Sequence, residues 1–196
     1  MTRTVGSSGP KTLKAIRKAG LRLIYEHGYE AMSLRQLASE VGIQVGSLYN
    51  HISTKQDLLY DLIRSHLEQV LGELEETLGG ADEPVELLKR FVAFHLTYHM
   101  VRKGEVFIAN SELRSLEPNH YEEIVVLRRR YEKRLIDILE AGKAAGLFAP
   151  VDARVAAYGI LALLTGICTW FRPHGRLGKE QIIEVYTEFV LKGLKP

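Results

Sequence analysis

The clearest structural signal in the sequence is the segment SLRQLASEVGIQVGSLYNHISTKQDLL, residues 33–59. Ser33 is predicted to cap a helix, because its hydroxyl can accept a hydrogen bond from a free backbone N–H group of the first turn. The apolar residues that follow recur at the i, i+3, i+4, i+7 spacing of one buried face: Leu34, Leu37, Ala38 and Val41. Gly42 can adopt the left-handed backbone that ends a helix. The spacing therefore predicts a helix followed by a sharp turn.

A second, short helix is predicted after the turn, at about residues 45–50. So few residues do not form a stable helix alone, so packing of Leu48 and Val45 must hold it. Its other side chains can then face outward, where hydrogen-bonding groups suit phosphates and base edges. This layout predicts a helix-turn-helix DNA reader. The residues expected to contact DNA are Arg35, Gln44, Val45, Gly46, Ser47, Tyr49, His51 and Lys55.

Lys55 is predicted at the start of the next helix, where a cation gains nothing from the helix dipole. A nearby anion explains it better, and a DNA phosphate is the obvious candidate. Gly46 and Ser47 are small enough for the backbone to approach a duplex closely.

Residues 13–27 and 33–59 together resemble the DNA-binding domain of the TetR family of bacterial repressors. The matching positions are Ser33, the Leu37-Ala38 pair, Gly42, the GSLYNH run at 46–51, and Lys55 four residues beyond the His. Gln44 departs from the family pattern, since a capping Ser is usual there, and it could instead reach a base edge. Ile52 replaces the usual Phe, which changes core packing. An ordinary helical hairpin without a DNA role would not require Gly46, Tyr49, His51 and Lys55 together.

Charge is distributed unevenly along the chain. The 196 residues carry a formal net charge of +2, yet residues 1–60 hold eight Lys or Arg against four Asp or Glu, which leaves 18 against 20 in the remainder. This asymmetry concentrates phosphate affinity in the N-terminal part. Residues 1–10 are predicted to be a polar flexible arm without a secretory signal, with Arg3 in a minor groove as the alternative to no role. We expect an arm at 1–10, a DNA-binding domain at 11–56 and a second domain at 57–196.

The rest of the sequence predicts helices with short breaks and no convincing strand. The expected fold is therefore all-α, with an N-terminal three-helix DNA-binding domain and a C-terminal antiparallel helical bundle. The lone cysteine, Cys168, is consistent with a reducing cytoplasm. The expected helices after the DNA reader span 54–78, 84–101, 104–116, 119–145, 152–171 and 179–194.

Residues 155–171 form an apolar run of seventeen residues without a charge. A membrane span is the alternative, but about twenty residues are needed to cross a bilayer, so no membrane role is expected. A helix that is apolar all round is buried on all sides, which in a small chain favours contact with a second subunit. The TetR resemblance implies the same: the C-terminal domain binds a small effector, and the helices at 152–171 and 179–194 form a homodimer.

Candidate effector-binding residues lie on two of the predicted helices. On the helix at 84–101 they are Phe91, His95, Tyr98 and His99, and on the next helix they are Phe107, Asn110 and Arg114. Apolar cavities with a few placed polar groups are typical of small-molecule sites, although these aromatic residues could equally be core. His95 and His99 could hold a metal at i, i+4 spacing, but no third ligand is evident. We therefore expect neither a metal site nor a cofactor.

A weaker resemblance links residues 110–132 and the WFRPHGRL run at 170–177 to TetR proteins that respond to acyl-coenzyme A thioesters. It adds Trp170 and Arg128 to the candidate ligand site. Arg128, Arg129 and Arg130 could bind the phosphates of such a ligand, because guanidinium pairs with phosphate oxygens. A solvated helix face or ion pairs between helices explain the same three arginines.

The sequence thus predicts a cytoplasmic transcriptional regulator that binds double-stranded DNA. The resemblance implies a repressor that is released from an inverted-repeat operator by a small hydrophobic effector such as an acyl-coenzyme A. The alternatives are a DNA-binding protein without an effector and a multidrug-type sensor. An enzyme is not expected, since the sequence lacks a phosphate-binding Gly loop, a nucleophile elbow and a strand framework to carry them.

Overall fold

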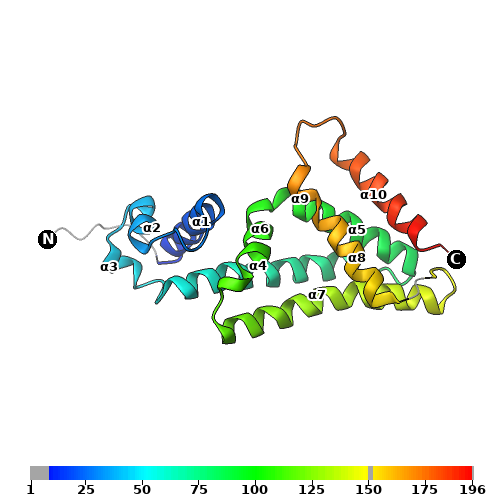
Figure 1. Ribbon diagram of the computed structural model, residues 1–196, viewed down its shortest axis with the longest axis horizontal. Helices are drawn as coiled ribbons and strands as arrows, with labels where there is room; N and C mark the ends of the chain where they lie inside the picture. The colour runs from blue at the N-terminus through cyan, green and yellow to red at the C-terminus, as the bar shows by residue number, and fades with distance from the viewer. Residues whose placement is uncertain (1–8, 150–151, 196) are drawn as a thin grey trace. The chain divides into compact units, whose positions relative to one another are not determined.

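The computed structural model describes residues 9–149 and 152–195, and every regular element in this part of the chain is helical (Figure 1). This confirms the predicted all-α class. The α-helices are α1 (Gly9–His27), α2 (Leu34–Val41), α3 (Val45–Leu48), α4 (Lys55–Leu78), α5 (Pro84–Val101), α6 (Lys103–Ser111), α7 (Pro118–Ala144), α8 (Ala153–Thr165), α9 (Ile167–Trp170) and α10 (Lys179–Gly193). A short 3₁₀ helix, η1 (Leu113–Ser115), lies between α6 and α7.

The predicted start and end signals of α2 are confirmed. Ser33 Oγ accepts a 3.1 Å hydrogen bond from the N–H of Gln36, and Gly42 has φ 74°, in the left-handed region. Side-chain caps also begin two later helices, because Asp152 accepts from the N–H of Val155 and Glu83 accepts from the N–H of Glu86.

Three predicted helices have different bounds in the structure. The recognition helix α3 ends at Leu48, and its predicted last residues form a tighter turn in which the N–H of His51 donates to the carbonyl of Leu48. The helix expected at 104–116 is α6 followed by η1. The helix expected at 152–171 is two helices separated at Gly166, a residue of low helix propensity. Gly9 and Pro10, expected in the arm, begin α1, while Arg3 lies outside the described residues.

The described chain divides into two compact units. Unit 1 contains the residues up to His66 together with Gly104–Ile124, and unit 2 contains Leu67–Lys103 together with the residues from Val125 onward. These limits differ from the expected domains at 11–56 and 57–196, because the first turns of α4 and the segment 104–124 pack with the N-terminal helices.

Unit 1 has a core built from α1, α2, α3 and the start of α4. Gly20 of α1 lies so close to α4 that an added Cβ would be 3.0 Å from a methyl group of Leu58. Two ion pairs fix the same helix from outside, since Arg17 bonds Asp61 of α4 twice at 2.6 Å and Arg22 pairs with Glu40 of α2. Its fully buried side chains include Ile16, Leu23, Ile24, Leu37, Leu48, Leu58 and Leu59.

Unit 2 is organised around α5, which contacts α8, α9 and α10 (Figure 1). Lys103, at the start of α6, donates from Nζ to the carbonyl of Phe171 just after α9, and its ammonium lies 5.2 Å from the centre of that ring. The core side chains include Leu88, Phe91, Val92, Leu96, Leu135, Leu139, Leu164 and Ile167.

Candidate nucleic-acid interface and ligand pockets

The turn between α2 and α3 leaves the side chain of Gln44 exposed and without a bond to the backbone of α3. Gln44 is the N-cap residue of α3, with φ −73° and ψ 148°, and its carbonyl accepts hydrogen bonds from the N–H groups of Ser47 and Leu48. Its side chain makes no cap bond and is exposed. A side-chain amide in this state can donate and accept at a base edge.

The structure brings most of the expected DNA-binding residues to one short segment. Leu48 is completely buried and anchors α3, while Tyr49 is 54% exposed. An added Cβ on Gly46 would meet nothing within 4 Å, so packing inside the chain does not require glycine there. Of the remaining expected residues, Arg35, Gln44 and Ser47 are exposed, whereas Val45 and His51 are half-buried.

Lys55 has partners inside the chain. Its Nζ donates a 3.2 Å hydrogen bond to the carbonyl of Glu30 and lies 4.2 Å from the ring centre of Tyr29. These contacts give a cation at the start of α4 an explanation within the chain, beside the predicted contact with a DNA phosphate. An ammonium has three N–H donors, and a phosphate contact would use another of them.

Exposed lysines of α1 add positive charge that the motif analysis missed. Arg17 and Arg22 of this helix are neutralised by carboxylates, whereas Lys11, Lys14 and Lys18 are exposed, and no ion pair is found for them within the described residues. The excess of positive charge in residues 1–60 includes these lysines and is the sequence signal that could have pointed to them. The start of α1 lies beside the reader, because an added Cβ on Gly9 would be 4.0 Å from the His51 ring.

A buried polar cluster forms around His95 in unit 2. One ring nitrogen of His95 is 3.0 Å from the hydroxyl of Tyr131, and the other is 3.2 Å from the hydroxyl of Thr165. The His99 ring stacks on the His95 ring, with centroids 3.7 Å apart and planes 12° apart. The N–H at Nδ1 of His99 donates a 2.8 Å bond to the carbonyl of His95.

Burial keeps both histidines neutral. Desolvation lowers the pKa of His95 well below its ordinary value, and it lowers the pKa of His99 from 6.5 to about 4. Desolvation also raises the pKa of the Tyr131 phenol, which stays protonated. Within the described residues, no group of three His, Cys, Asp or Glu side chains could hold a metal ion.

The expected ligand residues are divided between the two units. Phe107, Asn110 and Arg114 belong to unit 1, where the exposed Phe107 ring packs edge-on against Tyr25 at 5.2 Å, Asn110 donates to the carbonyl of Val106, and Arg114 is exposed. The others belong to unit 2. There Phe91 is completely buried core, Arg128 is half-buried, and Trp170 is 49% exposed and stacks on Tyr186.

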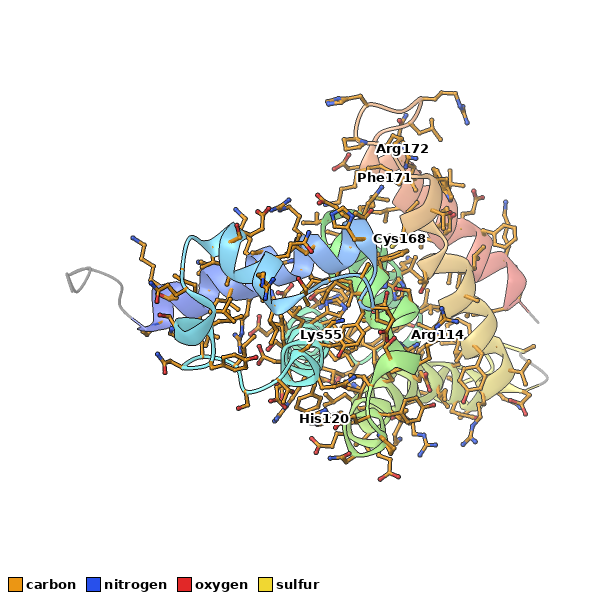
Figure 2. The ribbon with its side chains drawn as sticks, turned by 60° about the vertical axis from the view of Figure 1, so that its left-hand side comes forward. Lys55, Arg114, His120, Cys168, Phe171 and Arg172 are labelled. Atoms are coloured by element: carbon orange, nitrogen blue, oxygen red, sulfur yellow. The ribbon has the colours of Figure 1, made fainter. Side chains whose placement is uncertain are left out.

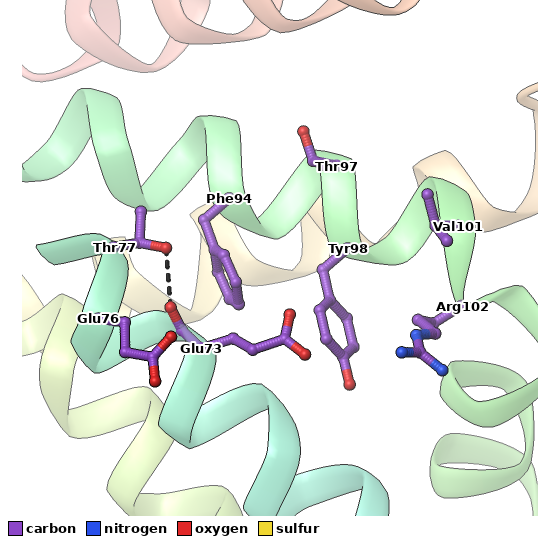
Figure 3. A pocket seen from close by; sticks show the side chains of 8 residues that line it. All are labelled: Glu73, Glu76, Thr77, Phe94, Thr97, Tyr98, Val101 and Arg102. Atoms are coloured by element: carbon purple, nitrogen blue, oxygen red, sulfur yellow. Dashed lines mark hydrogen bonds between the residues drawn. The ribbon is translucent and has the colours of Figure 1, made fainter.

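An open pocket of about 620 Å³ lies between α4 and α5 of unit 2. Figure 3 shows carboxylates contributed by α4 and aromatic rings contributed by α5. Only Tyr98 was among the expected ligand residues. Phe94, Tyr98 and Arg102 recur at i, i+4, i+8 spacing on one face of α5. Residues 91, 95 and 99, which were expected to bind a ligand, recur with the same spacing on the neighbouring face. Helical spacing alone therefore did not show which face of α5 lines the pocket. The lining residues are Glu73, Glu76, Thr77, Phe94, Thr97, Tyr98, Val101 and Arg102.

Large apolar side chains are exposed on α8, α9 and α10. Val155 is 67% exposed and Phe189 is 66% exposed, and Tyr158, Leu163, Trp170 and Val185 are also exposed. Ala153–Trp170 has a mean hydropathy of 1.4 and the length of a membrane span, and 28% of it is buried within the chain. A helix at an interface between soluble subunits has the same composition, so length and hydropathy do not establish a span.

Comparisons with known proteins agree with this arrangement. Residues 16–62 match the bacterial regulatory proteins of the tetR family, and residues 81–194 match the tetracyclin repressor-like C-terminal domain. The chain is 28% identical over 173 residues to the HTH-type transcriptional repressor KstR2 of Mycolicibacterium smegmatis, which covers 86% of this chain and 83% of that protein.

Two solved structures are similar over nearly the whole chain. A tetR-family regulatory protein from Rhodococcus RHA1 superimposes with a TM-score of 0.88 at 29% identity, covering 96% of this chain and 98% of that one. AibR, in complex with isovaleryl coenzyme A and operator DNA, superimposes with a TM-score of 0.84 at 26% identity, covering 91% and 97%. Because the C-terminal match alone spans more than half of the residues, the chain belongs to the TetR family, whose members are DNA-binding regulators and not enzymes.

Proposed function

We propose that this protein is a cytoplasmic, homodimeric transcriptional repressor that binds an inverted-repeat operator and is released by a small hydrophobic effector, an acyl-coenzyme A thioester. The observation that carries the proposal is the α2–α3 helix-turn-helix in a TetR-family chain, with Gln44, Ser47 and Tyr49 exposed around a buried Leu48. Gly46 adds a backbone that a duplex can approach closely.

The short recognition helix argues for two readers on each operator. With only four residues, α3 contacts too few bases for one copy to be selective. Helix-turn-helix dimers solve this by reading two half-sites about one helical turn apart. The exposed apolar surface of α8 and α10 supports a homodimer through these helices, because burying it removes Val155 and Phe189 from water.

Support for an acyl thioester comes from relatives and from unit 2. AibR binds isovaleryl coenzyme A, and KstR2 is a repressor with sequence similarity over most of this chain. In unit 2 the side chains of His95, Tyr131 and Thr165 lie within an apolar core, so a ligand that entered this region would meet a few polar groups in apolar surroundings. The exposed Arg129 and Arg130 of α7 provide cations for phosphates.

The pocket between α4 and α5 favours a second candidate, a sensor of organic cations. Its lining combines the carboxylates of Glu73 and Glu76 with the rings of Phe94 and Tyr98, and carboxylates with aromatic faces attract organic cations. This candidate corresponds to the multidrug-type alternative.

Binding-site selection on random duplexes, followed by release with ligands, tests the proposal. Selection is expected to recover an inverted repeat that binds two protomers, and an acyl thioester is expected to release it where free coenzyme A does not. Selective binding by a monomer to one half-site would contradict the dimer. Release by organic cations alone would favour the second candidate, and the absence of selective DNA binding would remove the function.

A further inference from the structure

A segment distant in sequence packs in unit 1 against α1, the turn that follows it and the start of α4. This segment, residues 104–124, contains most of α6, all of η1 and the first turns of α7, and we call it the α6–α7 corner. It lies outside the N-terminal family match at residues 16–62. Its contacts with these elements are specific hydrogen bonds as well as ring packing.

Gln56 connects α4 to the α6–α7 corner through both ends of its side-chain amide. Its Nε2 donates a 2.6 Å hydrogen bond to the carbonyl of Ser115, and its Oε1 accepts a 3.2 Å bond from the N–H of Glu117. Both backbone groups lie in the turn where η1 ends and α7 begins. A side chain that satisfies a donor and an acceptor together fixes the position of that turn relative to α4.

Glu112 makes a second connection, to the turn after α1. One of its carboxylate oxygens accepts a 3.3 Å bond from the N–H of Tyr29, and the other accepts a 3.1 Å bond from the hydroxyl of Ser115. The same turn is held from the other side by Lys55, which bonds the carbonyl of Glu30 and covers the Tyr29 ring. Gln56, Glu112 and Lys55 therefore hold neighbouring parts of one junction.

Aromatic contacts reinforce both ends of the α6–α7 corner. Phe107 packs edge-on against Tyr25 of α1, at 5.2 Å between ring centres. Tyr60 of α4 stacks on His120 at 4.1 Å, and its hydroxyl donates to Glu123. Figure 2 shows Lys55 on α4 and His120 on α7, so the two helices that share this junction can be followed there.

We infer that the α6–α7 corner is a working part of the DNA reader, and that Gln56 and Glu112 are positioning residues for DNA recognition. Recognition helix α3 ends at Leu48, and only six residues separate it from Lys55, which Gln56 follows directly. Fixing the start of α4 therefore fixes the direction in which the chain leaves α3. The inference rests on the proposed DNA binding, but it goes beyond the helix-turn-helix segment to which that function is assigned.

The test uses the full-length protein with Gln56→Ala, Gln56→Met and the control Gln69→Ala. Gln69 lies in the same helix and makes an exposed hydrogen bond to Glu73, so its substitution removes an amide without touching the junction. Binding to the selected operator and to a random duplex would be measured by fluorescence anisotropy over a range of salt concentrations. The unfolding temperature of each variant would be recorded, together with the fraction of its molecules that can bind operator, as found by titration.

Both Gln56 variants are expected to weaken operator binding roughly tenfold, which corresponds to losing two hydrogen bonds. The salt dependence should stay unchanged, because no phosphate contact is lost. Random-duplex binding should change less than operator binding. A merely structural role would lower unfolding temperature and active fraction but leave the affinity of the folded fraction intact, which would overturn the inference. Wild-type affinity in Gln56→Met would overturn it as well, since packing without hydrogen bonds would then suffice.

Glu112→Ala, with Glu122→Ala as its control on the exposed side of α7, repeats the test at the second connection. A loss of operator affinity in Glu112→Ala only is the expected result, and equal behaviour of the two variants would overturn the role of Glu112. Failure of the wild-type protein to bind any operator would instead contradict the proposed function, so the two failures are distinguishable.

Discussion

The two units distribute polar and apolar side chains in opposite ways. In unit 1 the hydrogen-bonding residues around α3 are exposed and the apolar residues are buried, as in Gln44 and Tyr49 against Leu48. In unit 2 a polar cluster around His95 is buried, while large apolar residues such as Phe189 are exposed on α10.

Each distribution of side chains suits a different kind of partner. Exposed polar groups on a rigid helix are ready to meet a polar surface such as DNA without rearrangement. An extended exposed apolar surface is typical of a site that another surface covers, and buried polar groups must find hydrogen-bond partners inside the protein. We therefore expect DNA binding by unit 1 to change when single polar contacts are removed. We expect the association and stability of unit 2 to change with the burial of apolar side chains and the protonation of buried histidines.

The largest expected effect comes from charging the apolar surface of unit 2. Phe189→Asp should convert the dimer to a monomer and weaken operator binding more than 100-fold, because a carboxylate cannot be buried unpaired at an interface, at a cost of roughly 3 kcal/mol or more. Analytical ultracentrifugation and operator titration would measure both. Glu184→Ala, at an exposed polar position of α10, is the control. A Phe189→Asp protein that stays dimeric would contradict the interface assigned to α8 and α10.

A smaller, position-specific effect is expected at Gln44. Gln44→Ala should cost about 1–3 kcal/mol of operator binding at one base position and spare random duplexes, because a base-edge contact carries sequence information. Competition with operators substituted at each position would locate the effect. A uniform loss across all duplexes would show that Gln44 contacts the DNA backbone instead.

Acid should weaken unit 2 through its buried histidines. Unfolded His99 takes up a proton below its ordinary pKa of 6.5, whereas the folded protein resists until about pH 4, so stability falls as pH decreases through this window. The expected loss for His99 between pH 7 and pH 5 is roughly 2 kcal/mol, and His95 adds to it. Urea unfolding at both pH values would measure it, with His99→Phe losing the part due to His99 and exposed His174→Gln retaining the full dependence.

The smallest expected effect is at Lys55, where it distinguishes a contact with DNA phosphate from the contacts with Glu30 and Tyr29. Lys55→Ala should flatten the salt dependence of binding by roughly one unit on every duplex, since one fewer counterion is released. Lys18→Ala, which removes a cation of α1 that has no ion pair among the described residues, provides the comparison. If Lys55→Ala lowered thermal stability but left the salt slope unchanged, Lys55 would have only a structural role, through its contacts with Glu30 and Tyr29.

Much of unit 1 could be predicted because its signals are local. Ser33 and Gly42 act on backbone groups within a few residues, so their caps follow from sequence. The partners of Lys55 and Gln56 could not be predicted, since Glu30, Ser115 and Glu117 reach them only through the tertiary fold.

In unit 2 the helices followed from spacing, but the residues that line the pocket between α4 and α5 did not. Neighbouring stripes of α5 carry similar residues, and only packing shows that Phe91 is core while Phe94 lines a pocket. Packing likewise placed Phe107 in unit 1.

The most direct test of the account is a reciprocal titration of the operator complex with acyl thioesters of graded chain length, using free coenzyme A as the control. If unit 2 senses the effector and unit 1 reads DNA, ligand and operator must weaken each other by the same factor, with a coupling of about 1–3 kcal/mol. The account predicts release by at least one thioester and equal factors in both directions. Ligand affinity that is identical with and without saturating operator would contradict the coupling of the two units.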